Sequence, residues 1–235
     1  MTGDSGGPLF SFSGVTGGYG ATTVVRSVGG AVAAGEACCV LGRNGVGKTT
    51  LMRLLTGHLP LQSGSVSFDG QPLDGLAPDR RHNLGLVYCP QERPVFDNLS
   101  VRENLSLMSS AEVEGRYAPY FAAFPILEAR MAQSAGTLSG GERKILSFVR
   151  GAAEPGRLLL LDEPSEGVQQ ENVERMAGFL HEAKAGGRGL LIVEQNLAFA
   201  LEIADRVIVM DHGEVVLAGA AADMTEATLA AHMHV

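Results

Sequence analysis

The stretch GRNGVGKT, residues 42–49, has the pattern G-x-x-x-x-G-K-[ST] of a phosphate-binding loop. The apolar run ACCVL at 37–41 precedes it and predicts a buried strand. The segment TTLMRLLT at 49–56 follows it and predicts a helix that ends near Gly57 and Pro60. A chance glycine-rich turn is the alternative interpretation. The order of strand, loop and helix favours the phosphate-binding loop.

Each part of this loop has a physical role in holding a triphosphate. Its glycines allow backbone N–H groups to turn inward on the phosphates, and the following helix directs its N-terminus at the anion. Lys48 is expected to place its charge near the β- and γ-phosphates, and Thr49 to offer its hydroxyl to Mg²⁺. The residues predicted to contact the nucleotide here are Gly42, Arg43, Asn44, Gly45, Val46, Gly47, Lys48, Thr49 and Thr50.

A second motif, LLLLDEP at 158–164, ends an apolar run in two carboxylates. A buried strand would deliver Asp162 and Glu163 to the carboxyl edge of the sheet, where folds of this kind bind ligands. Asp162 is expected to hold Mg²⁺, directly or through water, and Glu163 to polarise the attacking water. The alternative is a strand that ends in a solvated acidic turn, which the presence of the phosphate-binding loop disfavours.

The third motif is LSGGE at 138–142, and the three motifs together are typical of one protein family. With the two motifs above, the chain resembles the ATP-binding subunits of ABC transporters from about Phe10 to its end. The resemblance implies that Ser139, Gly140, Gly141 and Glu142 form a binding segment for ATP held by an opposite subunit. An ordinary helix cap is the alternative, because Ser139 and Glu142 also have capping-box spacing. Both interpretations can hold, since the cap builds the anion site.

Three other positions match the family one by one. Tyr19 resembles the aromatic residue that stacks on adenine, with a core tyrosine as the alternative. Gln91 resembles the glutamine that reaches Mg²⁺ and contacts the membrane partner, with a solvated loop residue as the alternative. The segment SEGV at 165–168 stands where the family has its dimer-contact loop.

One position departs from many family members, which carry a histidine after the strand expected at 190–193. This chain has Gln195 there. Glutamine can hydrogen-bond a γ-phosphate but carries no titrating proton. The departure fits Glu163 as the catalytic base, with Lys48 and Gln195 as the other residues expected to take part in catalysis.

Apolar runs alternate with helical segments along the chain. A strand and turn are predicted at 65–70, and apolar runs typical of strands occur at 84–88, 158–161 and 190–193. An amphipathic helix is predicted at 168–185 and a hairpin over 206–217. Such alternation predicts a parallel sheet covered on both faces. With the resemblance, the fold class is α/β: a mainly parallel sheet of the P-loop NTPase type with flanking helices, an antiparallel β portion and an inserted helical subdomain. A single domain over 1–235 is expected, with its core at 10–91 and 152–235 and the helical subdomain at about 92–151.

Composition narrows the class of protein. The chain of 235 residues has 18 Lys and Arg against 26 Asp and Glu, a net charge of −8. This balance argues against a dedicated nucleic-acid binder. The cysteines Cys38, Cys39 and Cys89 are odd in number and form no CxxC pair, which indicates reduced, buried thiols. No apolar stretch approaches the length of a membrane span.

The segment GDSGGPL at 3–9 resembles the surroundings of the nucleophilic serine in trypsin-like proteases. In that family the histidine and aspartate precede the serine, whereas here Ser5 precedes all six histidines. We therefore interpret residues 1–9 as a flexible N-terminal extension and reject the protease hypothesis.

The resemblance implies an ATPase peripheral to the cytoplasmic face of the inner membrane. Its expected partners are ABC membrane subunits, a second ATP-binding subunit (the same or a different chain) arranged head to tail and, indirectly, an extracellular or periplasmic solute-binding protein. Gln195 is typical of importers of branched-chain amino acids, urea and short amides. Four segments favour urea: LGRNGVGKTT at 41–50, PQERPVF at 90–96, SEGVQ at 165–169 and GAAADM at 219–224. A soluble ABC ATPase without a transport role is the alternative.

Overall fold

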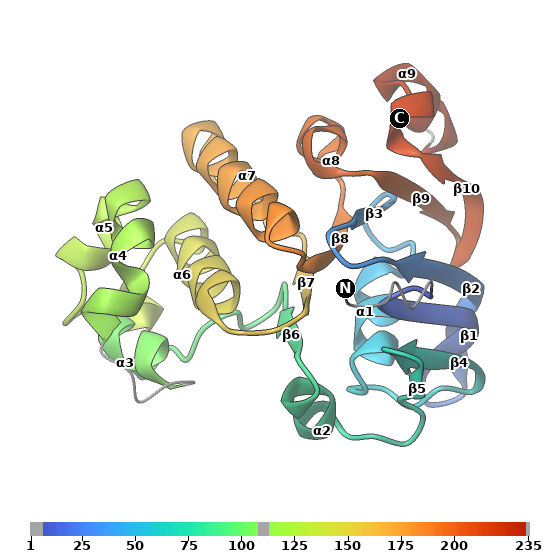
Figure 1. Ribbon diagram of the computed structural model, residues 1–235, viewed down its shortest axis with the longest axis horizontal. Helices are drawn as coiled ribbons and strands as arrows, with labels where there is room; N and C mark the ends of the chain where they lie inside the picture. The colour runs from blue at the N-terminus through green and yellow to red at the C-terminus, as the bar shows by residue number, and fades with distance from the viewer. Residues whose placement is uncertain (1–6, 108–112, 234–235) are drawn as a thin grey trace, which may run out of the picture.

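The computed structural model describes residues 7–107 and 113–233 and contains two sheets (Figure 1). The smaller sheet has the strand order β2-β1-β4-β5 and is antiparallel. The larger sheet has the order β10-β9-β3-β8-β7-β6. The strands are β1 (Phe10–Tyr19), β2 (Thr22–Val32), β3 (Ala37–Leu41), β4 (Ser63–Phe68), β5 (Gln71–Pro72), β6 (Leu86–Cys89), β7 (Leu158–Asp162), β8 (Gly189–Glu194), β9 (Arg206–Asp211) and β10 (Glu214–Ala220).

The larger sheet is parallel except for β10, which pairs antiparallel with β9. The strand predicted at 37–41 is confirmed as β3, and those at 158–161 and 190–193 as β7 and β8. The predicted hairpin is also confirmed as β9 and β10. The run at 84–88 is displaced: β6 begins at Leu86, because Leu84 and Gly85 form the turn that ends the preceding helix.

Helices connect these strands. They are α1 (Lys48–Leu55), α2 (Pro78–Asn83), α3 (Val101–Ser106), α4 (Val113–Ala123), α5 (Pro125–Ala129), α6 (Gly140–Ala153), α7 (Gln170–Ala185), α8 (Leu197–Ile203) and α9 (Glu226–His232), with 3₁₀ turns at Ala135–Thr137 and Ala221–Asp223. The capping box predicted for Ser139 and Glu142 is present at the start of α6, and Ser100 and Glu103 form another at the start of α3. The region expected to be helical lies between β6 and β7 and contains α3 to α6.

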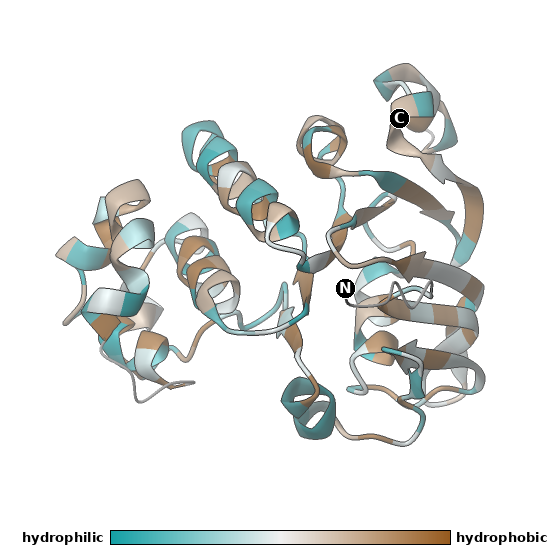
Figure 2. Ribbon diagram, in the orientation of Figure 1, coloured by the Kyte–Doolittle hydropathy of each residue, from teal (hydrophilic) through white to brown (hydrophobic). Residues whose placement is uncertain are grey.

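Strands β3, β7 and β8 of the larger sheet are buried on both faces, as their apolar sequences predict, whereas the edge strand β10 is mostly exposed. Along β3, Cys38 and Val40 pack with α1 and the antiparallel sheet, whereas Cys39 and Leu41 pack on the side of α6, α7 and α8. The central strands β7 and β8 are drawn largely brown in Figure 2, while the exposed helix α2 is teal. Burying both faces of a sheet stabilises it by about 25 cal/mol for each Å² of apolar surface removed from water.

The antiparallel sheet and helices α3 to α5 lie at opposite ends of the molecule, with α6 and α7 between them (Figure 1). All three cysteines are free and buried, as expected, and burial raises the pKa of each thiol. Within 7–107 and 113–233, no helix has the length and apolar character needed to cross a bilayer.

The N-terminal segment is only partly described. Ser5, the subject of the rejected protease hypothesis, lies outside the described residues. Leu9 is 4% exposed and packs in the core, and its carbonyl accepts a hydrogen bond from the backbone of Asp69 at 2.7 Å. The core therefore begins at Leu9, one residue earlier than the boundary expected from sequence.

Candidate nucleotide-binding site

The glycine-rich loop lies between β3 and α1, as its sequence predicts. Gly47 precedes the helix with φ of 108°, a left-handed conformation that side chains rarely adopt. The N-terminus of α1 therefore follows a sharp turn, and its first N–H groups lack partners within the helix. Arg43, Asn44 and Gly45 are exposed in the loop, whereas Lys48 is buried. This arrangement fits the binding of an anion by backbone N–H groups.

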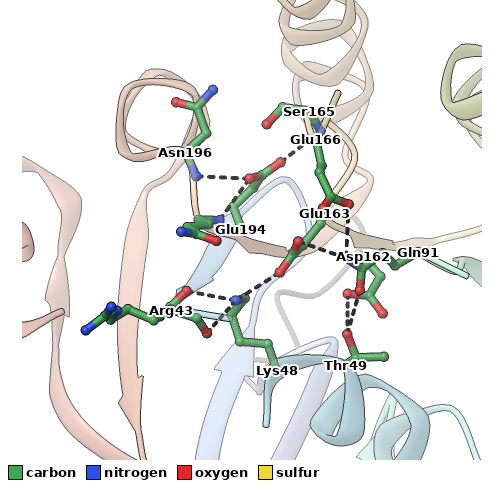
Figure 3. Close-up of polar contacts among 12 residues, drawn as sticks. Arg43, Lys48, Thr49, Gln91, Asp162, Glu163, Ser165, Glu166, Glu194 and Asn196 are labelled. Carbon is green, nitrogen blue, oxygen red and sulfur yellow. Dashed lines mark hydrogen bonds and ion pairs between the residues drawn. The ribbon is translucent and has the colours of Figure 1, made fainter. Parts of the chain in front are cut away.

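Lys48 is the buried cation of the site. Its Nζ donates to the carbonyl oxygens of Gly42 at 2.7 Å and Arg43 at 3.1 Å, and it lies 2.9 Å from Glu163 Oε1. Figure 3 shows the side chain extended between the loop and Glu163. The two charged side chains are only 3% and 5% exposed, so each depends on the other for neutralisation. A phosphate that takes Lys48 must compete with the Glu163 carboxylate.

Two oxygen-bearing side chains from other segments contact the Thr49 hydroxyl. Thr49 Oγ1 donates to Asp162 Oδ1 at 3.2 Å and to Gln91 Oε1 at 3.1 Å. Hydroxyl, carboxylate and amide oxygens are the ligands that Mg²⁺ prefers. The set fits Mg²⁺, although no group of three or more His, Cys, Asp and Glu side chains suited to a metal occurs in the described part of the chain. The structure brings these three residues together, and their role as Mg²⁺ ligands remains a prediction.

Asp162 is 2% exposed and also accepts a hydrogen bond from the Tyr88 hydroxyl at 3.2 Å. Burial raises the pKa of Asp162 to about 6, while its hydrogen bonds from Thr49 and Tyr88 act in the opposite direction. A cation beside this carboxylate would favour its ionised form. The sequence gives no sign that Tyr88 takes part.

Asp162→Asn should change how the free energy of unfolding depends on pH. The pKa of Asp162 rises from 3.8 to about 6 on folding, so the folded protein keeps a proton that the unfolded chain releases. This contribution to stability is complete below about pH 4 and is lost as the pH rises through about 6. Between pH 7 and pH 5 the wild type should gain about 1 kcal/mol relative to Asp162→Asn. Urea unfolding without nucleotide, at a series of pH values, measures this difference in the free energy of unfolding. If the wild type and Asp162→Asn show the same dependence on pH, the prediction is wrong.

Glu163 has an unusual backbone conformation, and hydrogen bonds from several elements hold it in place. Its φ is 48°, in the left-handed region that non-glycine residues occupy at a cost of about 1–3 kcal/mol. Its N–H donates to Val193 O at 2.9 Å, and its Oε2 accepts from Gln91 Nε2 at 3.0 Å. Its carbonyl accepts from Lys144 Nζ at 2.8 Å. The carboxylate is thereby fixed between Lys48 and Gln91.

Glu194, which the sequence analysis did not single out, links two loops of the site. It is 2% exposed, and its carboxylate accepts hydrogen bonds from the backbone N–H groups of Ser165 at 2.9 Å, Gln195 at 2.9 Å and Asn196 at 3.1 Å. Burial raises the pKa of this carboxyl. The Glu194 carboxylate holds the backbone N–H of Gln195, whereas the side chain of Gln195 is exposed. The sequence signal that could have identified Glu194 is its place at the end of the apolar run LLIVE.

The LSGGE motif forms the start of α6, apart from the phosphate-binding loop. Ser139 Oγ accepts from the backbone of Glu142 at 3.3 Å, and the Glu142 carboxylate accepts from the backbone of Ser139 at 2.8 Å. A side chain at Gly141 would meet the carbonyl of Gly167 at 2.7 Å, so this turn packs closely on the loop after β7. A surface pocket of about 810 Å³ opens here, and its lining contains none of residues 42–49.

Tyr19 ends β1 with 45% of its surface exposed, so it is not a core residue. Its hydroxyl accepts a hydrogen bond from Arg53 Nη1 at 2.9 Å, and Arg53 lies on α1. The structure thus brings Tyr19 to the helix that begins at Lys48. Its stacking on adenine remains a prediction.

Comparisons with known proteins agree with the geometry of these loops. The ABC transporter family model matches residues 25–166. The high-affinity branched-chain amino acid transport ATP-binding protein BraG of Pseudomonas aeruginosa is 33% identical over 213 residues, covering 89% of this chain and 91% of that protein. A probable branched-chain amino acid transport ATP-binding protein, LivF, of Archaeoglobus fulgidus is 36% identical over 195 residues, covering 80% and 81%. A solved ATP-binding subunit of an ABC transporter superposes with a TM-score of 0.80 at 27% identity, covering 90% of each chain.

Proposed function

This chain belongs to the ABC transporter family of ATP-binding subunits, and on that premise we propose that it powers an importer of branched-chain amino acids. As a member of the family it is an ATPase whose hydrolysis is coupled to transport. The cargo assignment is supported by the names of the two relatives described above. The convergence of Lys48, Asp162 and Glu163 at the ends of β3 and β7 is the observation that carries the site's assignment to ATP.

In the proposed reaction, the chain's own residues position a triphosphate and a water molecule. The loop N–H groups and Lys48 hold the phosphates, and Glu163 accepts a proton from the attacking water. Thr49, Asp162 and Gln91 would hold Mg²⁺, which supplies neutralisation of phosphate charge when bound. The Gln195 amide is assigned to the γ-phosphate. Tyr19, at the other end of α1, is assigned to the adenine ring.

We assign the LSGGE motif to ATP held by a second subunit. The capping box orders Ser139, Gly140 and Gly141 at the start of a helix of 14 residues, where N–H groups are available to an anion. The separate pocket described above supports this assignment, because it lies apart from the chain's own phosphate-binding loop. ABC ATPase subunits dimerise. Here the partner is the same chain or a different one, arranged head to tail.

A groove of about 910 Å³ is the proposed contact for the membrane subunits. It is lined in part by His58, Tyr88, Pro90, Glu92 and Phe96, and Phe96 is 57% exposed. An exposed aromatic beside a concave, mixed polar and apolar surface is suited to a protein partner. This contact would hold the chain at the cytoplasmic face of the inner membrane. A solute-binding protein would act on it only through the membrane subunits.

Deleting the gene should abolish uptake of labelled leucine at low concentration while leaving urea uptake unchanged. The cells would be complemented with the wild type and with Glu163→Gln, which separates lost hydrolysis from lost protein. Loss of urea uptake alone would contradict the amino-acid assignment and support urea, which the four sequence segments favour. Unchanged uptake of both solutes, without copurifying membrane proteins, would instead support a soluble ABC ATPase.

A further inference from the structure

Lys144 connects helix α6 to the backbone of Glu163. Its Nζ donates to the Glu163 carbonyl at 2.8 Å and lies 3.4 Å from Glu166 Oε2, and its side chain is 12% exposed. Lys144 and Glu163 are 19 positions apart in the sequence: Lys144 lies on α6, and Glu163 directly follows β7. The contact to the carbonyl is the shorter of the two and the better shielded from water, since Glu166 is 51% exposed. A charged donor makes a stronger hydrogen bond than a neutral one.

The carbonyl that Lys144 contacts belongs to a strained residue. A left-handed glutamate persists only when its surroundings hold it. The contacts from Val193, Lys48 and Gln91 come from β8, α1 and the loop after β6. Among these contacts of Glu163, only that of Lys144 comes from α6. Rotation of the Glu163 peptide group would move its carboxylate as well, so the position of α6 bears directly on the proposed base.

We propose that Lys144 is a positioning residue that fixes Glu163 to α6 and so links the two nucleotide sites on this chain. The inference rests on the proposed role of Glu163 as base. Ser139, at the N-cap of α6, and Lys144, just over one helical turn farther on, both line the pocket assigned to the second subunit's ATP. A shift of α6 when a phosphate binds at its N-terminus is therefore transmitted to the Glu163 carbonyl. Contact at one site then adjusts the base of the other.

Lys144→Ala should lower kcat by about 10- to 100-fold with little change in the ATP affinity of the chain's own phosphate-binding loop, because a displacement of roughly 1 Å at a positioned group reduces the rate by about a hundredfold. The full-length chain would be assayed alone and with copurified membrane subunits. Fluorescent-nucleotide binding without Mg²⁺ and the melting temperature are measured alongside. Lys144→Arg, which keeps a charged donor, should recover most of the lost kcat.

Lys184→Ala is the matched control. Lys184 also donates to one backbone carbonyl, Ile203 at 3.1 Å, and to one carboxylate, Asp205 at 3.1 Å, but it lies on α7 away from Glu163. It should lower the melting temperature and leave kcat unchanged. The inference is overturned if Lys144→Ala keeps kcat within about twofold, if kcat and affinity fall together, or if Lys184→Ala gives the same loss of kcat. An inactive wild type would contradict the proposed function itself.

Discussion

Glu163→Gln should slow ATP hydrolysis by about 10²–10⁴-fold, the usual contribution of a general base, while ATP binding is kept. The amide cannot take a proton from water. It can still accept a hydrogen bond from Lys48, whose Nζ lies 2.9 Å from Glu163 Oε1. Because the variant weakens that contact, Lys48 is freer to move to a phosphate. ATP affinity should therefore be at least that of the wild type.

The measurement combines a single-turnover ATPase assay with light scattering at saturating Mg·ATP. Bound ATP that is not hydrolysed should cause the variant to accumulate as a dimer. A variant that stays monomeric would count against pairing of this chain with itself and favour a different partner subunit. Hydrolysis at a wild-type rate would contradict the assignment of Glu163 as base.

Glu166→Gln is the matched substitution three residues away. Glu166 Oε2 also accepts from Gln91 Nε2, at the same 3.0 Å, but its side chain is 51% exposed. The Glu163 side chain, in contrast, is 5% exposed and pairs with Lys48. Glu166→Gln should slow hydrolysis far less than Glu163→Gln. Equal effects would indicate that the Gln91 contact, rather than proton transfer, controls the rate.

The parallel sheet was predictable because its strands carry the signal themselves. ACCVL, LLLL and LLIV are apolar throughout, which is expected only for strands covered on both faces. The motifs then follow the carboxyl ends of β3 and β7, two parallel strands that both pair with β8. Lys48 follows β3 and Glu163 follows β7, so their meeting is a consequence of the parallel order.

The antiparallel sheet carries a weaker local signal: of its strands, only β4 was predicted from the residues, at 65–68. Strand β1 contains Gly14, Gly17 and Gly18, and its pairing with β2 changes register three times. Small residues and bulges weaken the alternation that would mark a strand. This strand forms through pairing with β2 and with β4, which is distant in sequence. The family resemblance predicted an antiparallel β portion, but no strand was predicted at Phe10–Tyr19.

The contacts that tie the site together were equally hidden. Glu194 reaches Ser165 across 29 residues, and Lys144 reaches Glu163 across 19. Glu194 is marked locally only by its place at the end of the apolar run LLIVE, and nothing in the local pattern distinguishes Lys144 from other side chains on an amphipathic helix. Their partners are backbone groups, which leave no mark in the sequence. Motifs can therefore locate the reacting residues, while the groups that position them require the packed structure.

Lys48→Ala should abolish ATP turnover and weaken ATP binding by about 10- to 100-fold, since a hydrogen bond to a charged group contributes about 1.5–3 kcal/mol. Nucleotide binding by fluorescence and turnover by phosphate release measure the two effects. Ser5→Ala, a change in the protease-like segment, should leave turnover intact. Loss of all activity in Ser5→Ala would contradict the ATPase assignment.

Lys48→Ala should also destabilise the folded chain, and this second effect must be separated from the first. Removing one partner of a buried ion pair lowers stability by about 3–5 kcal/mol, because the other charge is left uncompensated. Here that charge is Glu163, whose side chain is 5% exposed. The double variant Lys48→Ala/Glu163→Gln removes both charges and should regain most of the lost stability in urea unfolding. Its turnover should stay absent. A double variant as unstable as Lys48→Ala would mean that Lys48 stabilises the fold through the carbonyls of Gly42 and Arg43 rather than through Glu163.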